Sequence, residues 1–243
     1  MALIIIGGIG FLTWEDIKKN KWHFQKYRVQ TKVILTVTAL LIIFPTLYFY
    51  FFEFTDLPLG ERILCSLFQA VTPRTAGFNT ADLTGLSETG RMLIIMLMLI
   101  GGSPGSTAGG MKTTTIAVLF SSALSVFRHR EHAHFFKRRI PNDTVRTAAT
   151  VFLMYIVLFE SSAMIISRLE SIPLLTAMFE TASAIGTVGL TIGITPRLGL
   201  ISQFMLIGLM FFGRVGGLTL IFAAMSGKGM AASKYPQEKI TVG

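Results

Sequence analysis

The stretch MLIIMLMLIGGSPGSTAGGMKTTTIAVLF, residues 92–120, decides how this chain folds, because a glycine-rich break interrupts an apolar run. Its glycines and Pro104 cannot sustain a helix. The apolar flanks, 89–100 and 113–127, are each too short to cross about 30 Å of hydrocarbon at a rise of about 1.5 Å per residue. Together they predict one membrane crossing that a loop breaks near its middle.

This loop shares only its glycine spacing with a phosphate-binding loop. Gly105 and Gly110 are separated as in a Walker A motif, but Met111 stands where the lysine is required and displaces Lys112. We therefore expect no nucleotide at this loop.

An intramembrane serine hydrolase is the enzymatic alternative, with Ser103 or Ser106 as the nucleophile. It needs a general base within reach of the hydroxyl. All four histidines fall in basic segments outside the apolar runs, which leaves Lys112 as the nearest base in sequence. Because no histidine lies near these serines in the sequence, we expect no enzyme activity.

Composition and charge place the chain in a membrane. Hydrophobic residues make up 51% of the 243 residues and charged residues 14%, as in integral membrane proteins. The net charge is +9, and most basic residues fall in three segments, 18–32, 128–146 and 228–239, as the positive-inside rule expects of cytoplasmic segments. Membrane orientation explains this charge better than nucleic acid does. The single cysteine, Cys65, excludes an intrachain disulfide framework and a cysteine metal cluster.

Besides the broken crossing, the sequence predicts three spanning helices, over 33–54 with a kink at Pro45, over about 144–167 and over about 200–226. Two further pieces, 61–80 and 171–193, are too short and too polar to span. Each predicts a short helix followed by glycine-containing extended chain. With the basic segments inside, both pieces begin and end outside. They are therefore re-entrant loops, which membrane depth tolerates only in a cavity or within protein.

The chain also repeats itself. Thr75-Ala76-Gly77-Phe78 in the first re-entrant piece matches Thr187-Val188-Gly189-Leu190 in the second. From Gly77 to Gly101 is 24 residues, and from Gly189 to Gly213 is also 24. The sequence thus predicts a helix, re-entrant loop, helix unit used twice in the same orientation. The N-terminal run MALIIIGGIGFLTWEDI resembles the end of a further unit, so we expect the chain to be the C-terminal part of a longer protein.

The two Thr-x-Gly loops are candidate cation sites. A short helix that enters from outside points its partially negative C-terminus at the membrane centre, where it favours a cation. Backbone carbonyls of the following chain can replace the hydration shell of an ion, and glycine permits the positive φ that this arrangement requires. One such motif is common in proteins, but two at equivalent places in a repeat favour the cation site over an incidental loop.

Several motifs together resemble the ion-translocating subunit of the Trk/Ktr/HKT superfamily of potassium transporters, most closely the Ktr type. They are TPRTAGFNT (72–80), GGSPGSTAGGMKTTT (101–115), ASAIGTVGLT (182–191), FFGRVGGLTL (211–220) and KYPQEKITVG (234–243). The resemblance implies an all-α integral membrane fold, in which four helix–pore loop–helix repeats surround one pathway. By motif, this chain supplies the third and fourth repeats, and so only half of the filter.

The resemblance also implies the order of segments. We expect the end of a preceding helix at 1–14, a cytoplasmic basic loop at 15–32, the third repeat at 33–127, a second basic loop at 128–143, the fourth repeat at 144–226 and a cytoplasmic tail at 227–243.

The site residues implied by the resemblance fall into two groups. The K⁺ filter would comprise Thr75, Ala76, Gly77, Phe78, Thr187, Val188, Gly189 and Leu190. The loop in the broken helix would be a gate beneath this filter, comprising Gly101, Gly102, Ser103, Gly105, Ser106, Thr107, Gly109 and Gly110, together with Arg214. A static helix break that serves only packing is the alternative to a gate.

Charged residues near these loops have open assignments. Arg214 lies mid-span, where an arginine costs at least about 2.5 kcal/mol, so it should face the pathway or a partner. It would bind carbonyls of the gate loop or form a positive barrier below the filter. We expect Arg74 and Lys112 to anchor their loops, and Glu160 to pair structurally with a neighbouring repeat. Glu180, Asp82 and Glu88 would either attract cations or lie on a solvated surface.

The resemblance further implies K⁺ uptake across a bacterial plasma membrane, with some Na⁺ conductance and no organic cofactor in this chain. Its implied partners are the lipid bilayer, a second copy in a homodimer with a contact at 234–243, and a cytoplasmic ring of nucleotide-binding regulatory subunits of the KtrA type. The basic loop 128–139 is a candidate docking surface for that ring. The alternative function is a truncated, non-transporting fragment or assembly scaffold.

Overall fold

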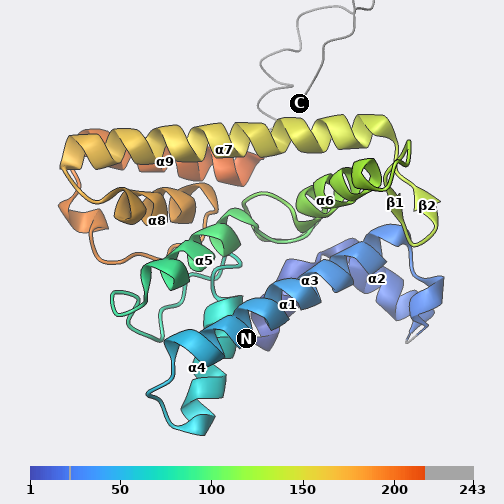
Figure 1. Ribbon diagram of the computed structural model, residues 1–243, viewed down its shortest axis with the longest axis horizontal. Coiled ribbons are helices and arrows are strands. Elements are labelled where there is room, and N and C mark those ends of the chain that lie inside the picture. Colours follow the sequence, from blue (N-terminus) through green and yellow to red (C-terminus); the bar gives the residue numbers. More distant parts are fainter. Residues whose placement is uncertain (22, 217–243) are drawn as a thin grey trace, which may run out of the picture.

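The computed structural model describes residues 1–21 and 23–216, and the part that it describes is mostly helical (Figure 1). Helices α1 (Ala2–Ile9) and α2 (Phe11–Asn20) follow one another with a break at Gly10, whose φ is 94°. The helix expected to end near residue 14 therefore continues, after this break, into the segment expected to be a loop. A short 3-10 turn, Phe24–Lys26, leads on to the next helix.

Helix α3 (Val29–Tyr48) continues into a π-helical turn, Phe49–Glu53. These 25 residues are long and apolar enough to cross a membrane, as expected for 33–54. Pro45 lies inside α3, and the backbone N–H of Phe49 is shared between the carbonyls of Pro45 and Thr46. The kink expected at Pro45 stays a prediction, and the irregularity seen is the π-helical turn that begins at Phe49, four residues later.

The first of the two pieces expected to be re-entrant contains helix α4 (Leu59–Val71), from which the chain runs through the Thr75 loop to helix α5 (Glu88–Leu99). The Ser87 hydroxyl caps α5 by accepting a hydrogen bond from the Gly90 N–H at 3.0 Å. The short helix followed by a loop, predicted here, is confirmed.

The break after α5 is a closed loop. Ile100 and Met111 pair as an isolated parallel bridge, and the Gly101 N–H donates to the Met111 carbonyl at 2.8 Å. Helix α6 (Thr113–Phe127) therefore starts close to where α5 stops, as predicted. We call residues 101–110 the gate loop.

A small hairpin, β1 (His134–Phe135) and β2 (Arg138–Arg139), departs from the all-helical expectation. The strands are antiparallel, and His134 lies opposite Arg139. Phe136 and Lys137 between them both have positive φ, as the central residues of a type I′ turn do. The sequence predicts only a loop here.

The second unit begins with the long helix α7 (Asn142–Glu170), which is also long and apolar enough to span a membrane. Helix α8 (Leu174–Ile185) is the second short helix, and after a 3-10 turn, Thr195–Arg197, helix α9 (Leu200–Val215) follows. In Figure 1, α9 lies along α7, with α8 against both. The remainder of the predicted last span, 217–226, and the expected tail, 227–243, lie outside the described residues.

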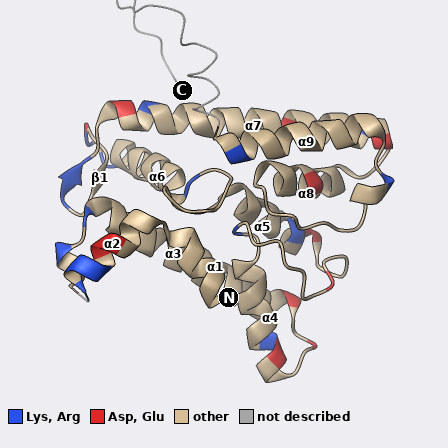
Figure 2. Cartoon of the chain, turned by 180° about the vertical axis from the view of Figure 1, so that it is seen from behind, with Lys and Arg blue, Asp and Glu red and all other residues tan. Residues whose placement is uncertain are grey.

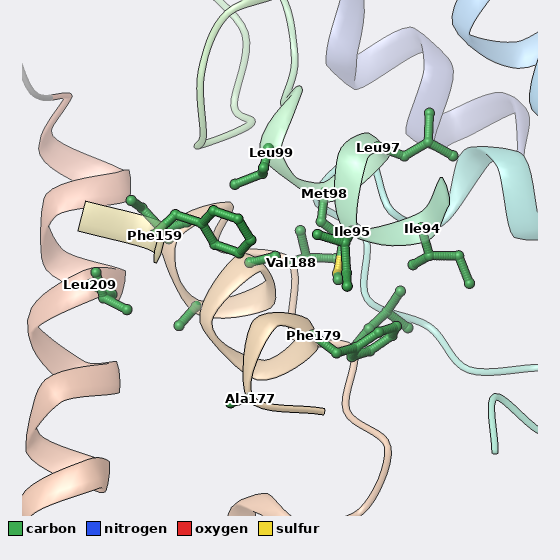
Figure 3. Close-up of a cluster of buried hydrophobic side chains, with 14 of the residues drawn as sticks. Ile94, Ile95, Leu97, Met98, Leu99, Phe159, Ala177, Phe179, Val188 and Leu209 are labelled. Atoms are coloured by element: carbon green, nitrogen blue, oxygen red, sulfur yellow. The ribbon is translucent and has the colours of Figure 1, made fainter. Parts of the chain in front are cut away.

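Side chains from both units form one apolar core (Figure 3). Ile94, Ile95 and Met98 of α5 are fully buried, and so is Phe179 of α8. Between helices in lipid, such contacts stabilise through close packing and dispersion rather than through exclusion of water. The core therefore fixes α5 against α8, and with them the loops that follow both short helices.

In each unit, at the end expected to face outside, a carboxylate that follows or ends the first long helix binds the start of the last helix. Glu53, after α3, accepts hydrogen bonds from the backbone N–H and the hydroxyl of Ser87 at the start of α5. Glu170, at the end of α7, accepts from the Gly199 N–H at 2.9 Å and from the Ser202 hydroxyl at the start of α9. A negative charge at a helix N-terminus is favourable. The internal repeat thus includes these two carboxylates, which we call clamps.

Candidate ion filter and gate loop

The two Thr-x-Gly loops lie against each other. A Cβ placed on Gly77 would lie 2.0 Å from the carbonyl oxygen of Val188 and 3.2 Å from the Cα of Gly189. Backbones approach this closely only where a residue lacks a side chain. Two segments more than a hundred residues apart therefore converge on one place.

Both loops have the same alternating backbone. Thr75 and Gly77 have φ values of 65° and 69°, and Thr187 and Gly189 have 53° and 92°. A β-branched residue at positive φ is a genuine outlier, and such strain concentrates at functional sites. The same two positions are strained in both copies, which makes the conformation a property of the motif.

The N–H groups of the loops turn back to the short helices. The Thr72 carbonyl accepts from the N–H groups of Ala76 at 3.1 Å and Gly77 at 3.2 Å. In the second loop, the Val188 N–H donates to the Ser183 carbonyl at 2.8 Å, and the Gly189 N–H to the Ser183 hydroxyl at 3.1 Å. A residue with a hydroxyl at or near the end of each short helix thus holds the loop that follows.

Unlike these N–H groups, the carbonyl oxygens of the loops have no hydrogen-bond partner among the described residues. Within residues 1–21 and 23–216, no hydrogen bond ends on the carbonyl oxygens of 75–77 or 187–189. Backbone carbonyls are otherwise almost always paired, so these six are available as ligands for a cation. The C-termini of α4 and α8 also lead into the loops and add partial negative charge.

The gate loop contacts the second Thr-x-Gly loop, 187–190, which we call the second filter loop after its expected role. A Cβ on Gly109 would lie 2.0 Å from the Thr187 Oγ1, and the Gly110 N–H donates to the Gly213 carbonyl at 3.2 Å. Gly101 also has no room for a Cβ, which would lie 2.0 Å from the Gly109 carbonyl oxygen. The glycines therefore allow the gate loop to press against Thr187 of the second Thr-x-Gly loop.

Two basic side chains bind carbonyl oxygens of the gate loop. Arg214 of α9 donates from Nη1 to the Thr107 carbonyl at 2.6 Å, and Lys112 donates from Nζ to the Ala108 carbonyl at 2.7 Å. The structure thus places Arg214 on the loop, which is one of its two expected partners, and Lys112 where it tethers the loop.

The gate loop is also bonded to the helix break at the N-terminus. The Ser103 N–H donates to the Gly8 carbonyl at 2.9 Å, and the Phe11 N–H donates to the Gly105 carbonyl at 3.1 Å. Gly10 has no room for a Cβ, which would meet the Pro104 carbonyl oxygen at 2.5 Å. The loop is therefore held between α9 and the break that separates α1 from α2.

Among the residues that the structure describes, no general base lies beside the serines of the gate loop. The Ser103 hydroxyl bonds to the Thr113 hydroxyl at 3.0 Å, and the Ser106 hydroxyl accepts from the Ala108 N–H at 3.4 Å. The Lys112 ammonium is directed to a carbonyl instead. These contacts do not match the geometry of a serine nucleophile.

Glu180 does not lie on a solvated surface, which was one of its two expected assignments. It is 3% exposed, and its carboxylate accepts from the hydroxyls of Thr191 and Thr195, at 2.6 Å each, and from the Ile192 N–H at 3.2 Å. It therefore braces the chain that leaves the second filter loop. This role could not be predicted from the sequence, because local patterns do not reveal where the loop that carries the three donors lies relative to Glu180.

The other charged residues occupy varied environments. Arg74 is buried, and its Nη2 donates to the Thr38 hydroxyl of α3 at 3.3 Å. Asp82 and Glu88 are exposed, and the Thr84 hydroxyl and N–H hold the pKa of Asp82 below its ordinary value. Glu160 is exposed on α7, and no partner for it lies within the described ranges.

A cavity of about 520 Å³ joins the second filter loop to the arginine of α9. It is lined by Ser183, Thr187, Val188, Gly189, Met210, Phe211 and Arg214. A pathway that continues from the filter would therefore pass the guanidinium that holds the gate loop.

Comparison with known proteins explains this arrangement. A family model described as a TrkH cation transport protein matches residues 1–233. The chain belongs to this family. The resemblance to the Trk and Ktr transporters found in the sequence is thus confirmed, as is the predicted place of the chain as an integral protein of a bacterial plasma membrane.

Individual relatives agree. The chain is 41% identical to the potassium/sodium uptake protein NtpJ of Enterococcus hirae, over 100% of this chain and 56% of that protein. It is 35% identical to the Ktr system potassium uptake protein B of Bacillus subtilis, over 99% and 55% respectively. The crystal structure of the potassium transporter TrkH from Vibrio parahaemolyticus has the same fold, with a TM-score of 0.74 at 19% identity, over 91% of this chain and 50% of that one. The chain thus spans about half the length of these relatives.

Proposed function

We propose that the protein containing this chain takes up K⁺ across the plasma membrane, and that the chain supplies the third and fourth helix–pore loop–helix repeats of its pathway. The observation that carries the proposal is the convergence of 75–77 and 187–189. Within the described residues their carbonyl oxygens accept no hydrogen bond, whereas the N–H groups of 76–77 and 187–189 are bonded to the ends of the short helices. Carbonyls fixed in this way can replace ion hydration without reorganising.

The filter has few carbonyl layers, because each loop has one glycine flanked by residues with side chains. A short filter discriminates less between ions of the same charge than a long one does. We therefore propose K⁺ as the main substrate with Na⁺ admitted in part. The name of the Enterococcus hirae relative, which pairs potassium with sodium, supports this.

The gate loop would close the pathway in the arrangement described. Gly109 lies against Thr187 at the base of the filter, and Arg214 and Lys112 hold the neighbouring carbonyls. Opening requires the loop to leave these contacts. The same loop is bonded to the break at Gly10, so movement of α2 or α9 would release or restrain it.

The proposed assembly is a homodimer of complete subunits with a cytoplasmic ring of nucleotide-binding regulators. The basic hairpin segment 128–139 is exposed over most of its length, as a docking surface must be. The proposed dimer contact at 234–243 lies outside the described residues.

A second candidate is a fragment or scaffold that does not transport by itself. It is compatible with the coverage of about half of each relative, because two loops would form only half of a fourfold filter.

Rubidium uptake in cells that lack potassium uptake systems tests both proposals. We expect the full-length protein to restore uptake, and Gly77→Asp to abolish it, since a carboxylate cannot fit against the Val188 carbonyl. Gly60→Asp is the matched control, because Gly60 lies in the first turn of α4 and has open space around it. Uptake by this chain alone would contradict the scaffold candidate, and uptake that survives Gly77→Asp in the full-length protein would contradict the filter.

A further inference from the structure

A second cavity, of about 490 Å³, lies away from the filter, between α3, α6 and α7. Val33, Val118 and Val151 line it from the three helices, and Phe135 lines it from the hairpin. Pro104 of the gate loop lines it as well. We call this cavity the gate-side slot. It runs from the gate loop to the basic hairpin.

The gate-side slot lies in the membrane leaflet at the basic end of the molecule. Its walls come from the first turns of α3 and α7, which directly follow the two basic segments. Thr144 and Thr147 of its rim are exposed, and Leu153, further along α7, is 63% exposed on an apolar helix. The positive-inside rule makes this the inner leaflet. The slot is therefore open to a surface that lipid chains cover.

Three arginines are close sequence neighbours of residues that line the hairpin end of the slot. Arg138 and Arg139 directly precede the lining residue Ile140, and Arg146 precedes Thr147. Figure 2 shows basic residues on the hairpin that contains β1. These three arginines are exposed and take part in no ion pair within the described part of the chain. Asp143, in the first turn of α7, is the one acidic residue between β2 and Thr147. Basic pockets between helices on the cytoplasmic side are suited to anionic lipid head groups.

We propose that the gate-side slot binds one acyl chain of an anionic phospholipid whose phosphate lies against the arginines of the hairpin. The apolar walls and the threonine rim suit a chain and its ester linkage, and the arginines suit the phosphate. Because Pro104 lines the same slot, the bound chain contacts the gate loop on the side away from the filter. Lipid binding at this slot is independent of whether the filter conducts K⁺.

Photolabelling of the full-length protein tests the proposal. The probe is phosphatidylglycerol with a diazirine on one acyl chain, in vesicles of equal parts phosphatidylcholine and phosphatidylglycerol, and adducts are mapped by mass spectrometry. We expect labels to concentrate in 114–118 and 147–151. Thr147→Trp, which fills the rim, should reduce these labels severalfold, whereas Leu153→Trp on the same helix outside the slot should not.

The head group is tested separately. Replacing both Arg138 and Arg139 by glutamine should lower labelling of the slot by roughly an order of magnitude, as expected for two basic residues at an anionic surface. With wild-type protein, a phosphatidylcholine probe should label the slot less than the phosphatidylglycerol probe. Equal labelling by the two probes, or labels spread evenly over the exposed faces of α7 and α9, would overturn the proposal. So would an unlabelled slot, the result expected if another part of the protein fills it. Since no readout depends on transport, failure here is distinct from failure of the proposed function.

Discussion

Arg214 and Thr107 are joined by a hydrogen bond of 2.6 Å that ties α9 to the gate loop across more than a hundred residues of sequence. The bond connects the two features that the sequence singled out at membrane depth, a lone arginine and a glycine-rich break. The carbonyl of the loop accepts a hydrogen bond from one nitrogen of the guanidinium, and the guanidinium in turn restrains the loop.

Removing this restraint should favour the open state. We expect Arg214→Gln in the full-length protein to raise rubidium uptake roughly tenfold, the scale of one charge-assisted hydrogen bond. Arg197→Gln, in the 3-10 turn that precedes α9, is the control and should leave uptake unchanged. Uptake that falls in the Arg214 variant while expression and folding are retained would contradict the restraint.

Gly109 should tolerate no side chain. A Cβ there would lie 2.0 Å from the Thr187 Oγ1, so Gly109→Ala must push the gate loop off the filter. We expect raised uptake and a loss of stability of about 1–3 kcal/mol, the usual cost of overpacking. Gly208→Ala in α9, where a Cβ meets nothing within 4 Å, is the matched control. Unaltered gating and stability in Gly109→Ala would show that the loop does not press on Thr187.

Glu170 should contribute to stability rather than to transport. Glu170→Gln loses the charge at the N-terminus of α9, and we expect a loss of about 1 kcal/mol in the free energy of unfolding. Thermal unfolding in detergent measures this loss. Glu131→Gln, at an exposed position in the basic loop, serves as the control. A variant as stable as the wild type would mean that Glu170 is dispensable as a clamp.

Asp16 should make stability depend on pH. It lies in α2, outside the spanning helices. Burial acts to raise its pKa, but hydrogen bonds from Thr31, the Arg28 N–H at 2.8 Å and Asn20 at 2.7 Å outweigh burial and hold the pKa below its ordinary value. A carboxyl with a lowered pKa in the folded state stabilises at pH above its unfolded pKa, and this contribution is lost as the pH falls through the folded pKa.

We therefore expect the unfolding temperature of the wild type to fall as the pH is lowered from about 5 towards about 3, around the ordinary pKa of an aspartate. The fall should be smaller in Asp16→Asn, which has no carboxyl to protonate. Equal pH slopes for the two proteins would count against these bonds.

The helices and their breaks could be predicted because their signals are local. Pro104 and the glycines around it end α5 at Leu99, and the short length of the two re-entrant helices follows from where apolar residues stop. The positions of Gly77 and Gly189 followed from the repeat, and their close approach in space agrees with a shared site.

What the sequence did not reveal depends on contacts between distant residues. In the sequence, Glu180 is a pore-helix residue with no visible partner, because its bonds to Thr191 and Thr195 form only when the following loop folds over it. Ser183 and Thr72 become loop anchors only when the chain turns back on the short helix. The hairpin at Phe136 and Lys137 was missed because neither residue belongs to the Asn-Gly type that favours its turn.

The central claim is that carbonyl oxygens of 75–77 and 187–189 contribute half of the ligands of a dehydrated monovalent cation. Anomalous scattering from crystals of the full-length protein grown with Rb⁺ tests it most directly. We predict a Rb⁺ peak between the two loops, next to the carbonyls of Gly77 and Val188, that is lost when Na⁺ replaces Rb⁺. A Rb⁺ peak bound by side chains elsewhere, with none between these loops in protein that transports, would contradict the account.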